Sequence, residues 1–250
     1  MDKIKVGIVN YLNTAPLIYG LQNGAIGDEI ELIPDFPSNL ARDLKEGKID
    51  LGLVPVAIIP ELKQWFLNGN YCIGSTGPVA SVCLFSEVPL ENVESVLLDY
   101  QSRTSVELAK ILLRDYWKLQ PEFIAAKPGY QNKIKGTTAG LVIGDRSFEQ
   151  RLLSTYVYDL GEAWTAHTGL PFVYAAWVSN KPLGDEFISL FNKANAVGLN
   201  NLEVIISGHP YKSYDLRKYY TENISYILDD EKKEGLKRFL QLLTGLPDKY

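Results

Sequence analysis

The chain has 250 residues, of which 46% are hydrophobic and 22% charged, which is the composition of an ordinary globular protein. This length fits one large domain or two lobes of roughly 100 to 150 residues each. A net charge of −5 argues against nucleic acid or an anionic membrane as a partner, so an anionic ligand would depend on local donors.

Short β-rich runs alternate with helical runs at the start of the chain. The first helix carries Pro16 at an early position, where the missing N–H costs no hydrogen bond. Ser38 is the predicted cap of the second helix and Gly47 its end. This β-α-β-α-β order predicts a parallel sheet with helices on its faces. The predicted elements are strands at 6–9, 30–33 and 49–54, helices from 14 and at 39–46, and a short helix after 55.

A second alternating set interrupts the first. Two such units predict an α/β fold with two lobes, whose parallel or mixed sheets are flanked by helices around a central cleft. We expect the chain to cross between the lobes near 85–89 and again near 176–181. The first lobe is then residues 1–86 with 178–250, and the second is 87–177. The predicted elements are strands at 71–74, 81–86, 96–98, 123–124, 141–143, 156–158 and 171–178, and helices at 106–114, from 161, over 184–209 and around 236–243.

Polar side chains gather where the predicted strands end. Open parallel sheets bind ligands outside the carboxyl ends of their strands, and two facing sheets make a cleft that closes around a small molecule. Neutral donors with one or two arginines suit a small carboxylated ligand. The candidate residues are Tyr11, Asn13, Thr14, Pro55, Val56, Val79, Ala80, Ser81, Ser102, Arg103, Thr104, Ser105, Gly144 and Asp145.

The fragment Ser102–Ser105 is the most informative of these strand ends. It lies between a strand-like run and an amphipathic helical run, so three hydroxyls and a guanidinium meet the free N–H groups of a first helical turn. Such a terminus binds carboxylate or phosphate, and Arg103 adds a planar fork for a carboxylate. The alternative is that Ser102 only caps the helix and Arg103 points into water.

A second anion-binding element is predicted in the segment 77–81. Its glycine and proline let main-chain N–H groups approach a ligand closely. Asp145 is the one strand-end carboxylate expected to face the cleft, and it can equally cap its own helix.

Catalytic and metal-binding patterns are scarce. The sequence has no CxxC, HExxH, GxSxG, P-loop or GxGxxG string, so we expect no metal and no cofactor. Cys72 and Cys83 lie in apolar runs and are interpreted as buried, reduced thiols. His167 and His209 are interpreted as loop or surface residues. The residues alone favour a binding protein over an enzyme.

The chain contains no apolar run of about 18 residues and enters a strand directly after its first residues. We therefore expect no membrane span and a cytoplasmic location. Nothing in the sequence indicates an oligomeric state.

Five separated strings occur in a specific order along the whole chain. They are VNYLNTAPL at 9–17, LDYQSRTS at 98–105, IGD at 143–145, DLGEAW at 159–164 with TGLPFVYA at 168–175, and YYTENISYIL at 219–228. Together they resemble the chorismate dehydratase family of the futalosine route to menaquinone. The resemblance implies a fold like type II periplasmic binding proteins, chorismate as the substrate, and its dehydration to 3-(1-carboxyvinyloxy)benzoate.

The resemblance also implies roles for individual residues. Asn13 and Ser81 match the family's functional asparagine and serine and are therefore the expected catalytic residues, whereas His167 matches no motif position. We hypothesise that the substrate's own enolpyruvyl carboxylate takes the ring proton while the protein holds it in reach. Two alternatives are a solute-binding or sensor protein that leaves a small carboxylate unchanged, and the sister enzyme of the pathway, whose first loop differs.

Overall fold

A computed structural model of the chain describes residues 3–209, 211 and 213–245. None of the helices in these ranges has the length and apolar character of a membrane span. The strands are β1 Ile4–Ile8, β2 Ile30–Pro34, β3 Leu51–Pro55, β4 Phe66–Ser75, β5 Val82–Ser86, β6 Ser95–Leu98, β7 Glu122–Ala125, β8 Thr138–Ile143, β9 Tyr156–Asp159, β10 Phe172–Ser179 and β11 Ser225–Ile227. The helices are α1 Ala15–Gln22, α2 Pro37–Lys45, α3 Arg103–Asp115, α4 Arg146–Arg151, α5 Leu160–Thr168, α6 Asp185–Leu199, α7 Leu202–Gly208, α8 Leu216–Lys218 and α9 Asp230–Thr244.

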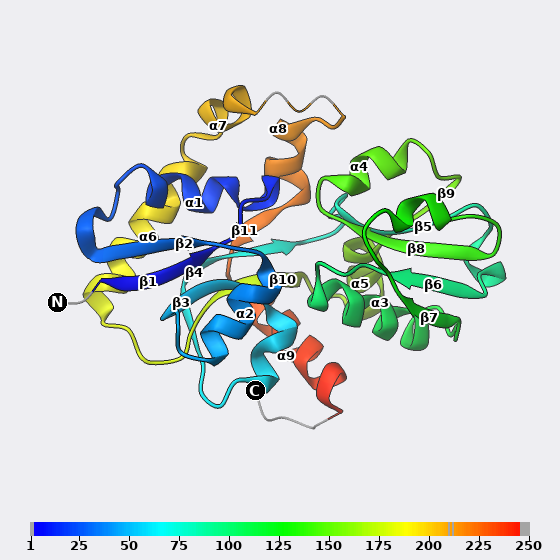
Figure 1. Ribbon diagram of the computed structural model, residues 1–250, viewed down its shortest axis with the longest axis horizontal. Helices are drawn as coiled ribbons and strands as arrows, with labels where there is room; N and C mark the ends of the chain where they lie inside the picture. The colour runs from blue at the N-terminus through cyan, green and yellow to red at the C-terminus, as the bar shows by residue number, and fades with distance from the viewer. Residues whose placement is uncertain (1–2, 210, 212, 246–250) are drawn as a thin grey trace.

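The first sheet has six strands in the order β11-β4-β10-β3-β1-β2. β1 pairs in parallel with β2 and β3, as the alternating pattern predicts, whereas β10 and β11 run antiparallel to their neighbours. Helices α1 and α6 lie together on one face of this sheet, and α2 and α9 lie on the other (Figure 1). A Cβ added to Gly20 of α1 would lie 2.0 Å from the Ala194 carbonyl oxygen of α6, so glycine permits this close helix contact.

The second sheet has five strands in the order β7-β6-β8-β5-β9. β6 runs parallel to β7 and β8, whereas β5 runs antiparallel to β8 and β9. Helix α4 covers one face, and α3 and α5 cover the other (Figure 1). The two sheets with their helices are the predicted two-lobed α/β arrangement.

The points where the chain crosses between the sheets differ from the prediction. β5 lies in the second sheet and β10 in the first, so the crossings fall at 76–81 and after β9, within 160–171. Each predicted crossing therefore follows the strand, β5 or β10, that the observed crossing precedes. The reason is physical: β5 and β10 are both buried apolar runs, and such a run does not encode which sheet it joins.

Two helix starts show which local signals determine a boundary. Pro37 is the first residue of α2, so Ser38 lies inside the helix instead of capping it, which corrects the prediction. Proline occupies this position because its fixed φ angle suits a first helical turn. At α3 the prediction is confirmed, since the Ser102 hydroxyl accepts a hydrogen bond from the Ser105 N–H at 3.2 Å.

The two lobes also contact each other outside the crossings, for example at the starts of α3 and α4. The Thr104 hydroxyl of α3 accepts a hydrogen bond from the Ala57 N–H of the first lobe at 3.2 Å. Phe148 of α4 stacks on Tyr214 of the first lobe, with ring centroids 4.4 Å apart. These contacts hold the lobes in a closed arrangement.

Candidate active site

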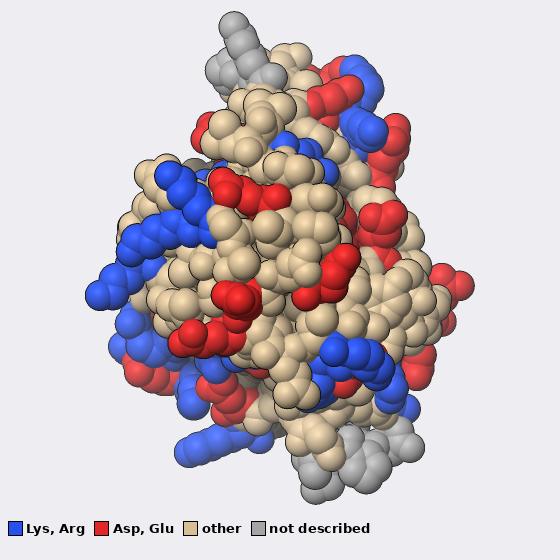
Figure 2. All heavy atoms as spheres, turned by 90° about the vertical axis from the view of Figure 1, so that its right-hand side faces the viewer, with Lys and Arg blue, Asp and Glu red and all other residues tan. Residues whose placement is uncertain are grey.

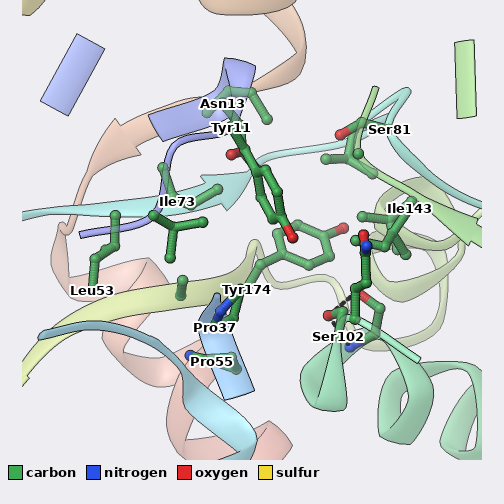
Figure 3. A pocket seen from close by; sticks show the side chains of 18 residues that line it. Tyr11, Asn13, Pro37, Leu53, Pro55, Ile73, Ser81, Ser102, Ile143 and Tyr174 are labelled. Carbon is green, nitrogen blue, oxygen red and sulfur yellow. Dashed lines mark hydrogen bonds between the residues drawn. The ribbon is translucent and has the colours of Figure 1, made fainter. Parts of the chain in front are cut away.

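A cavity of about 70 Å³ lies between the lobes, where strand ends of both sheets meet. Figure 3 shows Tyr11 and Tyr174 at its centre, with Asn13 and Ser81 on one side and Ser102 on another. Leu53, Ile73 and other apolar side chains complete the wall. Ligand pockets typically enclose roughly 300 to 1,000 Å³, so the lobes have to part before a metabolite can enter.

Many of the candidates predicted from the sequence lie together on this wall although they come from both lobes. The predicted residues that line the cavity are Tyr11, Asn13, Pro55, Val79, Ser81, Ser102, Ser105 and Gly144.

The remaining candidates lie outside the wall, and three of them have side-chain partners elsewhere. The Thr14 hydroxyl donates to the Val9 carbonyl at 2.6 Å and closes the turn after β1. The side chains of Thr104 and Arg103 bridge the lobes, the first to the Ala57 N–H and the second in an ion pair with Glu61. Because the Arg103 side chain is 55% exposed, the structure places it as a surface residue. Val56, Ala80 and Asp145 also lie outside the lining.

The main-chain N–H groups of Val79, Ala80 and Ser81 have partners within the protein, since that of Ser81 donates to the Val79 carbonyl. The Asp159 carboxylate accepts hydrogen bonds from the N–H groups of Val79 at 3.0 Å and Ala80 at 2.7 Å. Ala80 has a φ angle of +62°, a left-handed conformation that costs an alanine conformational energy. Asp159 therefore holds a strained turn, and this turn sets the position of Ser81.

The first-lobe rim offers polar atoms that have no partner among the described residues. They include the Tyr11 hydroxyl and the Asn13 side-chain oxygen, both buried. The Asn13 backbone carbonyl accepts a hydrogen bond from the Tyr226 hydroxyl at 3.0 Å, which fixes the turn that carries the amide. A buried polar group without a partner costs roughly 1 to 3 kcal/mol, so a ligand that bonds these groups removes this cost.

Ser81 is connected to a buried tyrosine. The Tyr219 hydroxyl donates to the Ser81 hydroxyl oxygen at 2.8 Å, and burial raises the pKa of Tyr219, so it stays protonated. Since the Ser81 oxygen accepts this bond, the hydrogen of its own hydroxyl is free to donate into the cavity.

The second-lobe rim consists of the N-terminus of α3. The Ser102 hydroxyl donates to the Ser105 hydroxyl oxygen at 2.8 Å, and both side chains line the cavity. The first-turn N–H groups of a helix lack partners within the helix and carry the positive end of its dipole. This rim is therefore suited to an anionic group.

The ionisable side chains on the wall of the described residues are two tyrosines. Burial raises the pKa of Tyr11 and raises that of Tyr174 still further, so both are neutral donors near pH 7. Histidine, lysine and carboxylate side chains do not occur in this lining. His167 instead packs against Tyr116 at a ring distance of 5.6 Å, and His209 follows α7, so both lie outside the cavity wall. The described residues contain no cluster of His, Cys, Asp or Glu of the kind that holds a metal ion.

Sequence reasoning missed three polar residues at or beside the cavity. Tyr174 lies near the start of β10, and because β10 is antiparallel to β3, its beginning meets the edge where β3 ends. The rule that ligands bind outside the carboxyl ends of strands does not identify a residue near the start of a strand. Gln101 precedes the predicted helix by two residues and lines the cavity, and Tyr219 occurs in one of the quoted strings. The signal for Gln101 is its position next to Ser102, and the signal for Tyr219 is its place in the string YYTENISYIL.

Acidic and basic side chains alternate over the outer end of the second lobe (Figure 2). Opposite charges placed side by side largely cancel at a distance. Binding of an anion therefore depends on the donors inside the cleft.

Comparison with known proteins relates this geometry to a family. The family model described as menaquinone biosynthesis matches residues 4–244. A chorismate dehydratase of Thermus thermophilus is 27% identical over an alignment 275 residues long. The alignment covers 97% of this chain and 95% of the relative. A chorismate dehydratase of Campylobacter jejuni is 26% identical over 249 residues, which span 96% and 97% of the two chains.

Solved structures share the fold. A protein of Archaeoglobus fulgidus superposes with a TM-score of 0.76 at 14% identity, covering 97% of both chains. The periplasmic aliphatic sulphonate binding protein of Escherichia coli superposes with a TM-score of 0.63 at 16% identity, covering 98% of this chain and 92% of the other. The expected periplasmic-binding-protein-like fold is thereby confirmed.

Proposed function

The chain belongs to the menaquinone-biosynthesis family, whose model spans nearly all of it, and on this premise we propose that it is a chorismate dehydratase. In this reaction chorismate loses water and becomes 3-(1-carboxyvinyloxy)benzoate. The enzyme is thus a hydro-lyase, and its substrate is a small dianion. We further propose that it works in the cytoplasm, where unpaired thiols such as Cys72 and Cys83 remain reduced.

One observation carries the proposal for the mechanism: the described cavity wall has neutral donors and lacks a side chain able to act as a base near pH 7. The substrate supplies the base instead. Its enolpyruvyl carboxylate takes the proton from the ring carbon that carries the ether, and the bond to the neighbouring hydroxyl breaks. The proton and the departing hydroxide together make the released water, and the ring becomes aromatic.

The protein contributes by holding this conformer. Alignment of reacting groups lowers a barrier by about 7 to 11 kcal/mol in favourable intramolecular cases. We assign the Asn13 amide and the Ser81 hydroxyl to the reacting side of the substrate, because both are directed into the cavity and free to donate or accept. A donor placed where charge develops contributes about 10² to 10³ in rate.

The second-lobe rim binds the other end of the substrate. Ser102, Ser105 and the N-terminus of α3 bind a carboxylate with hydroxyl and N–H donors. This assignment leaves the ring between the two rims, beside Tyr11 and Tyr174 (Figure 3). A closed cleft around it also excludes bulk water from the leaving hydroxyl.

The decisive experiment is incubation of the purified protein with chorismate. We expect the absorbance of a new aromatic product and a mass lower than that of chorismate by one water. Binding of chorismate without a change in absorbance would instead favour a solute-binding or sensor protein, for which the fold is equally suited. Turnover of the nucleoside-derived substrate alone would identify the sister enzyme.

A further inference from the structure

Behind the second-lobe rim lies a buried ionic network that the mechanism does not use. The Asp99 side chain has no exposed surface and accepts hydrogen bonds from Arg146 Nη2 at 2.7 Å and from the Tyr130 hydroxyl at 2.6 Å. Its other oxygen accepts the backbone N–H of Gln101 at 2.7 Å. The Arg146 guanidinium also lies 5.4 Å from the centroid of the Tyr100 ring. Arg146 is thus fixed from three sides.

This network determines how the Gln101 amide is oriented. Arg146 Nη2 donates to Gln101 Oε1 at 2.8 Å. A guanidinium has donors only, so the carbonyl end of the amide has to face Arg146 and the NH₂ end has to face away from it. Among the described residues, the NH₂ end reaches only the Tyr100 hydroxyl, at a long 3.3 Å, which leaves N–H capacity for a ligand.

Gln101 lies where the cavity opens to solvent. It lines the inner cavity and also an outer groove of about 270 Å³, whose walls include Tyr11, Phe36 and Tyr100. Phe36 is 61% exposed and Tyr100 44%, although both are aromatic. A ligand that extends from the cavity into this groove passes the Gln101 amide.

On the premise that the protein dehydrates chorismate, we propose that Gln101 is a specificity-determining residue for the dianionic substrate and that Arg146 is its positioning residue. Gln101 presents N–H donors to the carboxylate at the second-lobe rim. Arg146 does not line the cavity, and its charge is offset by the buried Asp99. It acts by keeping the amide from turning its oxygen toward the ligand.

A glutamate at position 101 separates this proposal from a role in packing. Glutamate has the shape of glutamine and still accepts the Arg146 hydrogen bond, so the network is retained. It replaces the N–H donors with a negatively charged oxygen beside an anionic substrate. Gln101→Leu removes the donors without adding charge. Gln22→Glu places the same substitution on the exposed surface of α1 and serves as the matched control.

The experiment measures KM and kcat on chorismate at low and high salt, with thermal melting to verify folding. We expect Gln101→Glu to raise KM at least about tenfold, because a close like charge costs more than a lost neutral hydrogen bond. Gln101→Leu should raise KM less, and Gln22→Glu should leave it unchanged. Salt should reduce the Gln101→Glu defect, because it screens the added like charge.

A double substitution tests the role of Arg146. In the unmodified background Arg146→Lys should raise KM, since lysine lacks the planar fork. In the Gln101→Leu background the same change should have no further effect on KM, because the group it orients is absent. Additive losses would contradict the positioning role. Equal KM values for Gln101→Glu, Gln101→Leu and the unmodified protein would overturn the proposal.

The test remains informative if the proposed function fails. Should the unmodified protein not convert chorismate, calorimetric binding of chorismate to the three proteins replaces KM. A loss of affinity in Gln101→Glu beyond that in Gln101→Leu supports the inference, and equal affinities refute it.

Discussion

The two rims of the cleft differ in how their polar groups are supported. On the first lobe, the Tyr11 hydroxyl and the Asn13 side-chain oxygen are buried and have no partner among the described residues. On the second lobe, Ser102 and Ser105 bond each other, and Gln101 is held by Asp99 and Arg146. A rim whose side chains are held in place by one another and still have free N–H groups is suited to anchoring a carboxylate. Unpaired groups on the first lobe gain the most hydrogen bonding from a bound substrate. We therefore place chemistry at the first rim and anchoring at the second.

The largest effect should follow from a change at the first rim. Asn13→Ala should lower kcat by about 10² to 10³ with a smaller change in KM, because the amide at the reacting side is lost. Steady-state kinetics on chorismate measures it. His167→Ala and His209→Ala are the controls and should retain kcat, since a general base contributes about 10² to 10⁴. A large loss of kcat in either histidine variant would indicate that this histidine is a conventional general base.

The connection between Ser81 and Tyr219 sharpens the account of this rim. Ser81→Ala should lower kcat by about 10², as expected for a lost donor near the reacting atoms. Tyr219→Phe removes only the bond that orients the Ser81 hydroxyl, so a loss of up to about tenfold is expected. The kcat of the double variant measures the coupling between the Ser81 and Tyr219 side chains. If Tyr219→Phe costs as much in the Ser81→Ala background, the orienting role is excluded.

At the second rim the effect should fall on binding and stability. Ser102→Ala should raise KM for chorismate and lower the free energy of unfolding by about 1 kcal/mol, because α3 loses its cap. Urea denaturation measures the stability. Ser38→Ala is the matched control, since Ser38 lies inside α2 and caps nothing. An unchanged KM together with the expected loss of stability would show that Ser102 caps α3 and does not bind the substrate.

The smallest effect concerns Asp145, which follows β8 and lies outside the cavity wall. Burial is the main cause that raises its pKa above 3.8, and the Leu12 N–H, His209 and Arg146 act in the opposite direction. A raised pKa means that its contribution to stability is full below the ordinary value and is lost as pH rises through the folded value. Asp145→Asn should therefore raise the melting temperature near pH 7 but not near pH 3. A stabilisation independent of pH would contradict this.

Much of the fold could be predicted because its signals are local. The cap at Ser102 depends on one side chain and its own helix. The carboxyl-end rule brought Asn13, Ser81 and Ser105 to one cavity from three segments. Arg103 lies outside the cavity wall, because Ser102 and Ser105 share a helix face that Arg103, one residue further round, does not share.

Other features depend on partners that the sequence does not encode locally. The lobe of β5 and β10 follows from sheet pairing, and the direction of β10 brings Tyr174 to the site. The N–H groups of 77–81 were expected to bind a ligand, but Asp159, 79 residues after Ala80, accepts two of them. Such long-range contacts have no signature in a short window.

The central claim is that the substrate's enolpyruvyl carboxylate is the base. The most direct measurement compares turnover of chorismate with turnover of its enolpyruvyl methyl ester at saturating concentrations. Our account predicts that the ester binds but is not dehydrated, because its carboxylate can no longer accept the ring proton. An ester that is converted with the kcat of chorismate would contradict the account and require a base from the protein.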